Sequence, residues 1–457
     1  MASRIFKRWS SSTTTTFIGK QTPSKAHLHQ PIPDFAFPRG FLVSGTHVGV
    51  KKSPGPPDLA LLVSSKHPTS AAAVFTANAF RAAPVTVSED VLAQTKGRAS
   101  ALVVNSGCAN AVTGAQGLAD AWSMARAVHN QVPGLPTVSD SEPPAALVMS
   151  TGVIGQPLPL ARILPGIAAA RKTLGESFEH WSSAARAFMT TDTFPKLRVR
   201  TFKLGDHECR LAGISKGAGM IHPRMVPPGP LHATLLAAFA TDAPVSPRAL
   251  TAALTYASAR SFNSISIDGD MSTNDTAALF ANGAGAPGMP ELQENHPEFN
   301  VFRNALTGIM QELAQLVVRD GEGATKLVTV DVQGALNYED AHAIASRIST
   351  SALVKTALYG EDANWGRILA ATGSVPLSKA LDPTRVSVSL IPRDGSAPLS
   401  LLTRGEPEKV DEVRAKEILV EEDIEIRVEL GLGKESAKYW TCDFSYEYVR
   451  INGDYRS

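Results

Sequence analysis

The chain has 457 residues, of which 43% are hydrophobic and 19% charged, so it can fill a large core and carries too little charge for a disordered chain. Its 44 basic and 43 acidic residues nearly cancel, and we expect no nucleic-acid-binding face. No apolar run approaches the ~18–20 residues that span a bilayer, which predicts no membrane contact, and three cysteines are too few for a disulfide framework.

The N-terminal segment 1–25 has the composition of a targeting sequence. The first 33 residues hold five basic residues and no acidic one, and Ser and Thr are abundant. This composition is typical of a mitochondrial transit peptide, whereas a secretory signal would need an uninterrupted apolar run. We therefore predict a transit peptide over 1–25, with a merely disordered tail as the alternative.

Helix and strand patterns alternate along the rest of the chain. Apolar residues recur at helical spacing in four segments: 114–132, 246–263, 302–320 and 339–358. Strand patterns occur in six segments: 99–105, 145–150, 327–333, 385–391, 424–430 and 440–448. Ser246-Pro247 is a typical helix start, with a capping serine and a first-turn proline. Interspersed helices and strands predict an α/β fold of packed layers.

Four short motifs match functional patterns in the wrong context. The GxGxxG match at 283–288 is followed by proline and polar residues instead of an apolar helix, so we interpret it as a surface turn. The GxSxG match at 213–217 lacks the helix that a nucleophile elbow needs. Residues 268–275 begin like a calcium loop but lack its glycine and glutamate. Cys108 fits a small buried residue better than a nucleophile.

A Gly- and Pro-rich loop over 216–232 leads into Ala233, Thr234 and an apolar segment. After a constrained loop, a threonine hydroxyl can attack the preceding carbonyl carbon and convert the amide into an ester, and hydrolysis then makes the threonine a new N-terminus. Its α-amine, with a pKa of about 7.7–8.0, can serve as base for its own hydroxyl. A threonine after a loop is also a common helix cap, so this pattern alone leaves both interpretations open.

Nine segments in order give the chain a family resemblance: NSGCANA (105–111), STGVIG (150–155), MTTDTFPK (189–196), KGAGMIHP (216–223), ATLLAAFATDA (233–243), DGDMSTNDT (268–276), DGEGATK (320–326), GEDANWGRI (360–368) and YVRINGDYRS (448–457). Together they resemble the ornithine acetyltransferase family, the bifunctional glutamate N-acetyltransferases of arginine synthesis, in a fungal mitochondrial form. The resemblance implies an α/β layered sandwich that is autoprocessed into an α chain (26–233) and a β chain (234–457), which remain one folded unit.

The resemblance also implies residue roles. Cleavage would fall between Ala233 and Thr234, and Thr234 would then be the nucleophile that accepts the acetyl group. Thr151 and Gly152 would supply the oxyanion hole. Six residues would contact substrate: Thr190, Lys216, Thr234, Glu322, Asn452 and Ser457. Opposite charges attract, so we expect Lys216 to bind a substrate carboxylate and Glu322 an ammonium group.

The implied reaction is a ping-pong transfer of acetyl from N2-acetylornithine to glutamate, with acetyl-CoA as a second donor for N-acetylglutamate. We expect small-molecule substrates, no metal or prosthetic group, and acetyl-CoA only as a co-substrate. The family implies α/β heterodimers that assemble further, in the mitochondrial matrix.

One segment departs from the family pattern. The family runs almost directly into Met-Ala-Thr, whereas VPPGPLH (226–232) stands here beside the expected cleavage point. Loop extensions cost little entropy, so we expect cleavage to persist. Two alternatives stay open: an N-terminal-threonine amidohydrolase or aminopeptidase that delivers the acyl group to water, and an uncleaved, inactive homologue that acts as a binding protein.

Overall fold

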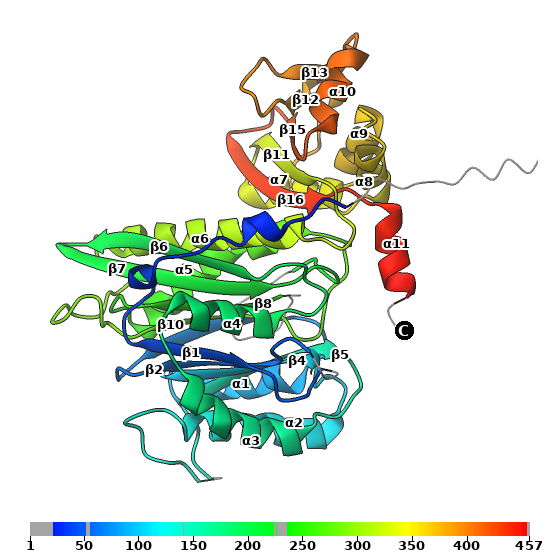
Figure 1. Ribbon diagram of the computed structural model, residues 1–457. Coiled ribbons are helices and arrows are strands. Elements are labelled where there is room, and N and C mark those ends of the chain that lie inside the picture. Colours follow the sequence, from blue (N-terminus) through cyan, green and yellow to red (C-terminus); the bar gives the residue numbers. More distant parts are fainter. Residues whose placement is uncertain (1–21, 52–54, 140, 224, 226–234, 455–457) are drawn as a thin grey trace, which may run out of the picture.

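Two lobes form the molecule, with the smaller above the larger in Figure 1. The computed structural model describes residues 22–51, 55–139, 141–223, 225 and 235–454. The predicted cleavage point and most of the predicted transit peptide therefore lie outside the described residues.

The larger lobe begins with a four-stranded sheet in the order β1-β2-β4-β5. Its strands are β1 (Phe41–Thr46), β2 (Leu59–Ser64), β4 (Ala101–Cys108) and β5 (Ala146–Val153). Three helices cover its outer face: α1 (Ala83–Gln94), α2 (Gly114–His129) and α3 (Leu160–Ala170). β4 and β5 run parallel, so their carboxyl ends lie at the same edge of the sheet.

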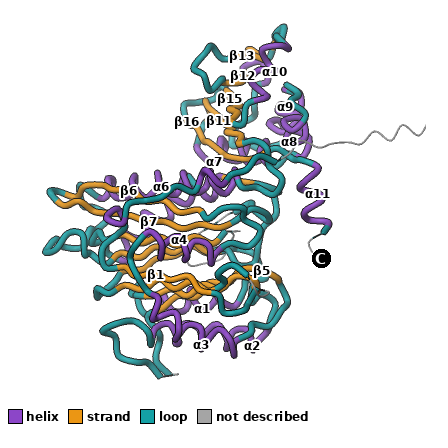
Figure 2. Tube along the Cα trace, viewed as in Figure 1, coloured by secondary structure: helices purple, strands orange, loops and turns teal. Residues whose placement is uncertain are grey.

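A five-stranded sheet in the order β3-β10-β8-β7-β6 packs against the first. Its strands are β3 (Ser70–Phe75), β6 (Lys196–Leu204), β7 (His207–Lys216), β8 (Leu236–Thr241) and β10 (Thr276–Ala281). Helices α5 (Pro247–Ala259) and α6 (Phe299–Arg319) cover its far face. Helix α4 (Phe178–Phe188) lies between the two sheets beside β1. Figure 2 shows strands between outer helices, a layered sandwich.

The central strand β8 shows how the sequence builds these layers. All of its residues are buried, and successive side chains point to opposite faces of the sheet. Leu236 and Ala238 belong to the core between the two sheets, whereas Ala237 and Phe239 belong to the core under α5 and α6. A continuous apolar strand is thus explained by burial on both faces.

The smaller lobe holds a seven-stranded sheet in the order β14-β13-β12-β15-β11-β16-β9. The strands are β9 (Ile265–Ser266), β11 (Leu327–Ala335), β12 (Ser387–Ile391), β13 (Leu399–Thr403), β14 (Glu406–Pro407), β15 (Asp423–Glu429) and β16 (Glu435–Cys442). The helices are α7 (Tyr338–Ser349), α8 (Ala352–Tyr359), α9 (Trp365–Gly373) and α10 (Glu412–Val420). Helix α11 (Tyr446–Gly453) leaves this lobe and descends beside the larger one.

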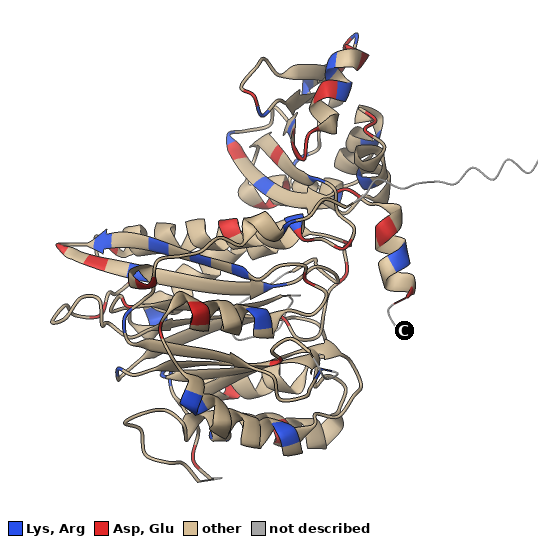
Figure 3. Ribbon diagram, viewed as in Figure 1, with Lys and Arg blue, Asp and Glu red and all other residues tan. Residues whose placement is uncertain are grey.

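Short 3-10 helices occur at Ala26–Leu28, Asp34–Ala36, Arg171–Thr173, Phe262–Ser264 and Pro383–Arg385. No helix among the described residues is long and apolar enough to cross a membrane. Basic and acidic residues are interspersed over both lobes in Figure 3.

The predicted layered α/β fold is confirmed, as are the helices expected over 114–132, 246–263 and 302–320. Two predicted elements are wrong in extent. The single helix over 339–358 is two helices, because the Ser351 side chain accepts the Val354 backbone N–H (3.4 Å) and begins α8. The strand over 440–448 ends at Cys442, because Ser445 caps α11 in the same way through Tyr448 (3.3 Å).

Candidate active site

A cavity of ≈ 370 Å³ lies where β5 and β7 end and where β8 and β10 begin. Every described residue that the sequence predicted for the site lines it: Thr151, Gly152, Thr190, Lys216, Glu322 and Asn452. Ala233, Thr234 and Ser457 lie outside the described residues, but Leu235, bonded to Thr234 in the chain, lines the cavity. Residues as far apart in the sequence as Thr151 and Asn452 therefore converge on one cavity.

Lys216, the last residue of β7, joins two of these segments. Its Nζ donates hydrogen bonds to Thr151 Oγ1 (3.1 Å) and Thr190 Oγ1 (3.3 Å). Burial lowers the pKa of Lys216, while the nearby carboxylates of Asp192 and Asp275 raise it. These contacts place an ammonium group and two hydroxyl groups together at the cavity wall.

A buried ion network supports this wall from behind. Asp192 accepts the backbone N–H groups of Thr190 (2.9 Å) and Gly217 (2.7 Å), so it fixes both segments that meet at Lys216. The fully buried Lys196 ammonium donates to Asp192 and to Asp320, at 2.6 Å each. Burial would raise the pKa of Asp192, but Lys196 and Lys216 hold it well below its usual range. Asp192 is thus an ionised anchor in the protein interior.

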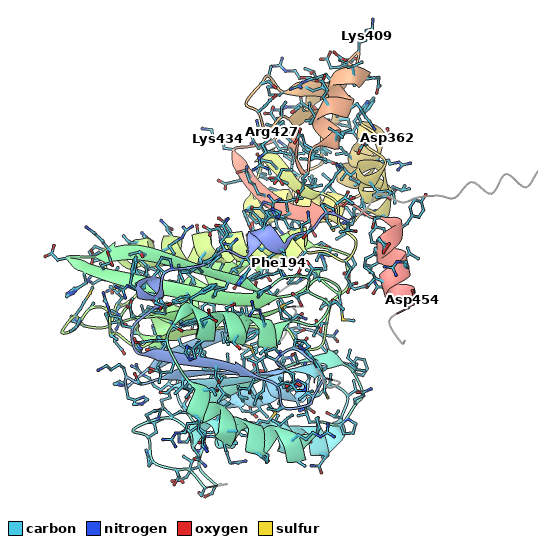
Figure 4. The ribbon with its side chains drawn as sticks, viewed as in Figure 1. Phe194, Asp362, Lys409, Arg427, Lys434 and Asp454 are labelled. Atoms are coloured by element: carbon cyan, nitrogen blue, oxygen red, sulfur yellow. The ribbon has the colours of Figure 1, made fainter. Side chains whose placement is uncertain are left out.

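The two carboxylates that bind Lys196, those of Asp192 and Asp320, have pKa values shifted in opposite directions. Burial and the neighbouring charge of Asp192 raise the pKa of Asp320, although Lys196 and Thr193 oppose the change. Thr193 donates its hydroxyl to Asp320 (2.5 Å) and lies outside the ≈ 370 Å³ cavity, unlike Thr190. Phe194, labelled in Figure 4 near the junction of the lobes, places its ring 4.9 Å from Lys196 Nζ.

Gly152 occupies a backbone position that only glycine fills without strain. Its φ is +132°, and a Cβ atom there would lie 2.3 Å from the carbonyl carbon of Gly107. β4 and β5 shift register at this point, which brings their backbones close together. The local bulge therefore sets the positions of Thr151 and Gly152 at the cavity edge.

Glu322 approaches the cavity from the end of α6. Its backbone N–H donates to Ala218 O (2.8 Å), and its Oε2 accepts the Asn452 side-chain amide (2.8 Å). Asn452 comes from α11, and Figure 4 labels Asp454 at the end of that helix. The C-terminal helix thus contributes Asn452 to the side of the cavity that carries Glu322.

Residues 268–275, whose sequence begins like a calcium loop, connect neighbouring loops through hydrogen bonds. Asp268 accepts the backbone N–H groups of Met220 (2.6 Å) and Ile221 (2.8 Å). Asn274 donates its amide to Ala109 O (2.5 Å) and Ser150 O (2.8 Å), which links the start of β10 to β4 and β5. Among the described residues no His, Cys, Asp and Glu side chains form a group that could hold a metal ion.

Sequence reasoning missed Asp192, Asp275 and Asp320. Each lies inside a segment that carries the family resemblance, where roles were assigned only to neighbouring residues. The available signal was an acidic residue beside buried apolar positions, where an unpaired charge is costly and needs a partner. Residues 213–216 of the GxSxG match lie in strand β7, and Cys108 is confirmed as buried.

The family model and the most similar curated sequences agree on one family. The ArgJ family model matches residues 42–457. The "Arginine biosynthesis bifunctional protein ArgJ, mitochondrial" of Postia placenta is 61% identical over 469 residues, and that of Laccaria bicolor 59% over 474, each covering 100% of both chains. The crystal structure of the arginine biosynthesis bifunctional protein argJ from Bacillus halodurans is 38% identical, with a TM-score of 0.43 over 47% of this chain and 96% of that chain.

Proposed function

The chain belongs to the ArgJ family, as a mitochondrial bifunctional acetyltransferase of arginine biosynthesis, and we propose that it works through an acetyl ester of Thr234. In the first half-reaction the Thr234 hydroxyl takes acetyl from N2-acetylornithine or acetyl-CoA. In the second, the amine of glutamate attacks the ester and leaves as N-acetylglutamate. Family membership favours this transfer over the amidohydrolase and the inactive-homologue alternatives.

One observation carries the proposal: the described residues assigned to the site converge on one cavity from both sides of the proposed cleavage point. Thr151, Gly152, Thr190 and Lys216 precede position 233, whereas Glu322 and Asn452 follow it. A set of unrelated surface residues would have no reason to share a cavity. Leu235 at the same wall supports a nucleophile at the adjoining position 234.

The charges of the cavity fit amino-acid substrates. Lys216 presents an ammonium group near one wall, and Glu322 presents a carboxylate oriented by Asn452. Charge-assisted hydrogen bonds of this kind bind a substrate carboxylate and a substrate ammonium group, respectively. Donors at Thr151 and Gly152 would stabilise the tetrahedral oxyanion of acetyl transfer, an effect worth roughly 3–4 kcal/mol per donor in known enzymes.

Self-cleavage belongs to the same proposal. The Thr234 hydroxyl oxygen attacks the Ala233 carbonyl carbon, the amide C–N bond breaks, and the hydroxyl proton passes to the departing nitrogen. Water then hydrolyses the ester, leaving an Ala233 carboxylate and a free α-amine on Thr234 that acts as base. The resulting α and β chains form a heterodimer in the mitochondrial matrix. The reaction uses no metal or prosthetic group, and acetyl-CoA is a co-substrate.

Intact-mass spectrometry tests this proposal. Recombinant protein should separate under denaturing conditions into two fragments, one beginning at Thr234. After incubation with N-acetylornithine and no glutamate, that fragment should gain the mass of one acetyl group, and added glutamate should remove it. A Thr234→Ala variant should remain one chain and gain no acetyl group. Full activity in Thr234→Ala, or ornithine release at the same rate without glutamate, would reject the mechanism.

A further inference from the structure

Asp275 is a carboxyl group of the cavity that the proposed cycle does not yet use. It directly precedes β10, which pairs with β8 in parallel register, with Thr276 opposite Leu236. The Thr276 N–H donates to Leu235 O at 2.6 Å, so Asp275 is level with Leu235, the residue bonded to Thr234. Asp275 therefore stands beside Leu235, the described residue that follows the proposed nucleophile in the chain.

The bonding of Asp275 is incomplete. Its side chain is 3% exposed, and within the described part of the chain its Oδ2 atom has no hydrogen-bond partner. Asp192, on the other side of Lys216, accepts two backbone N–H groups and the Lys196 ammonium. A buried polar atom without a partner is unfavourable and calls for an explanation. The unpaired Oδ2 atom of Asp275 is explained if its hydrogen-bond partner is a group of the bound substrate.

The surroundings of Asp275 suit proton exchange. Burial raises the pKa of Asp275 well above its usual range, while Lys216 and the Leu235 backbone N–H oppose that change. Lys216, from β7, and Glu322, from the end of α6, are the other charged side chains among the described residues that line the cavity. A carboxyl group so placed can hold a proton or release it to an amine.

We propose that Asp275 is a further catalytic residue, whose carboxyl group exchanges one proton with the reacting amino group of the amino-acid substrate in each half of the cycle. This inference rests on the proposed acetyl-Thr234 mechanism. The ammonium group of an incoming amino acid must lose a proton before its nitrogen can attack, and the Asp275 carboxylate can accept that proton.

The proton balance closes over the two halves. In the first, the Thr234 oxygen bonds to the acetyl carbon, the amide C–N bond breaks, and the hydroxyl proton passes through the α-amine to the departing nitrogen. The Asp275 carboxyl gives that amine a second proton, and ornithine leaves as an ammonium ion. In the second half, the glutamate ammonium returns a proton to the Asp275 carboxylate. Its nitrogen attacks the ester carbon, the C–O bond breaks, and its next proton restores the Thr234 hydroxyl.

With acetyl-CoA as donor, the balance differs in one place. The C–S bond breaks, and the hydroxyl proton passes to the thiolate, so CoA leaves as a thiol. Asp275 then gives its proton to solvent before glutamate enters. Acylation from acetyl-CoA should therefore depend little on Asp275, whereas transfer to glutamate should depend on it strongly.

The test compares two acceptors in an Asp275→Asn variant loaded from acetyl-CoA. Glutamate arrives as an ammonium ion, whereas hydroxylamine is a neutral amine near pH 7 and needs no base to attack. We expect transfer to glutamate to fall by about 100-fold or more, the usual contribution of such proton transfer, and transfer to hydroxylamine to stay within a few-fold of the parent. In the variant, glutamate transfer should also rise steadily with pH as the free amine becomes available.

Equal losses with both acceptors, or a parental pH profile in Asp275→Asn, would overturn the proposal. If the variant does not fold or self-cleave, the parent enzyme provides the test. Transfer from its acetyl-enzyme to glutamate should stay nearly level with pH above the pKa of Asp275, because the Asp275 carboxylate takes the proton from the ammonium form, and it should fall below that pKa. Without such a base, transfer would fall about tenfold for each pH unit throughout the range as the free amine disappears, and that result would overturn the inference. Failure of the ester mechanism itself is distinguishable, because no acetylated Thr234 fragment would form from either donor.

Discussion

At the scale of single residues, Gly152 shows how backbone geometry fixes the site. Its φ of +132° is strained for any residue with a side chain, and its neighbour across the bulge is the Gly107 backbone. Gly155, four residues after Thr151, also has a positive φ, +79°, but an added Cβ there meets no atom within 4 Å. A comparison of the two positions therefore distinguishes the effect of backbone strain, which both share, from that of a steric clash, which only Gly152 would have.

We predict that Gly152→Ala slows acetylation of the enzyme by about 100-fold or more, the usual cost of displacing an oxyanion donor. The added methyl group would lie 2.3 Å from the Gly107 carbonyl carbon, so β5 must move and carry Thr151 with it. The rate of acetyl-enzyme formation from acetyl-CoA measures the effect. Gly155→Ala is the control, which should lose about 1–2 kcal/mol of stability and keep its acetylation rate. Equal losses in both variants would show that strain alone is responsible.

The site was only partly predictable from its residues. Thr151, Gly152, Thr190, Lys216, Glu322 and Asn452 were identified through family segments, and the structure brings them together. The network of Asp192, Lys196 and Asp320 was not predicted. Charged residues are usually exposed, and the sequence alone does not show which of them the fold buries. The hydrogen bond from the Lys196 ammonium to Asp320 joins residues 124 positions apart in the sequence. Local patterns carry no information on such contacts.

At the scale of elements, helices with long apolar faces were predicted best. Periodicity located α2, α5 and α6, because each buries one continuous face against a sheet. The errors in these two elements came from single serines, Ser351 and Ser445, that begin new helices, since the apolar pattern continues across both breaks. The order of strands within each sheet was not predictable, because pairing between distant strands leaves no local signal.

The short segment 22–26 is an element whose role depends on where the transit peptide ends. Lys25 is 4% exposed, and its Nζ donates to Glu422 Oε1 at 2.5 Å. Glu422 also faces Arg319 at 3.3 Å, in the region where the two lobes meet. Residues 22–26 line a second cavity, of ≈ 790 Å³, which shares Thr191 and Glu322 with the candidate active site. These contacts favour a mature enzyme that keeps residues 22–25, so the transit peptide would be shorter than the segment 1–25 predicted from composition.

We predict that the mature protein begins at or before Lys25. The free energy of unfolding should be about 1–2 kcal/mol lower for a chain that starts at residue 26 than for one that starts at residue 22. The shorter chain lacks the ion pair between the buried Lys25 and the partly exposed Glu422. Urea denaturation compares the two, and Lys25→Met in the longer chain is the matched variant that keeps the apolar stem. N-terminal sequencing of protein from mitochondria gives the natural start. Equal stability, or a start beyond Lys25, would contradict the prediction.

At the scale of the whole molecule, the proposed cleavage divides a sheet in which two adjacent strands of one chain lie between strands of the other. The α chain would supply β3, β6 and β7, and the β chain would supply β8 and β10 between them. Ser70–Phe75 pairs with Thr276–Ala281 on one side, and Leu211–Lys216 with Leu236–Thr241 on the other. Because β8 is buried on both faces, separating the chains would expose the centre of the core. The cut enzyme should therefore unfold and dissociate in one step.

This coupling predicts a stability that depends on concentration. When unfolding releases two chains, tenfold dilution lowers the free energy of unfolding by about 1.4 kcal/mol, by mass action. The cleaved enzyme should therefore show a lower urea midpoint at each dilution, and loss of acetyl transfer should follow the same curve. The uncleaved Thr234→Ala chain releases no second fragment on unfolding, so its midpoint should move less with dilution than that of the cleaved enzyme. A midpoint independent of dilution in the cleaved enzyme, or chains that separate on a sizing column without urea, would show that the interleaved strands do not hold the two chains as one unit.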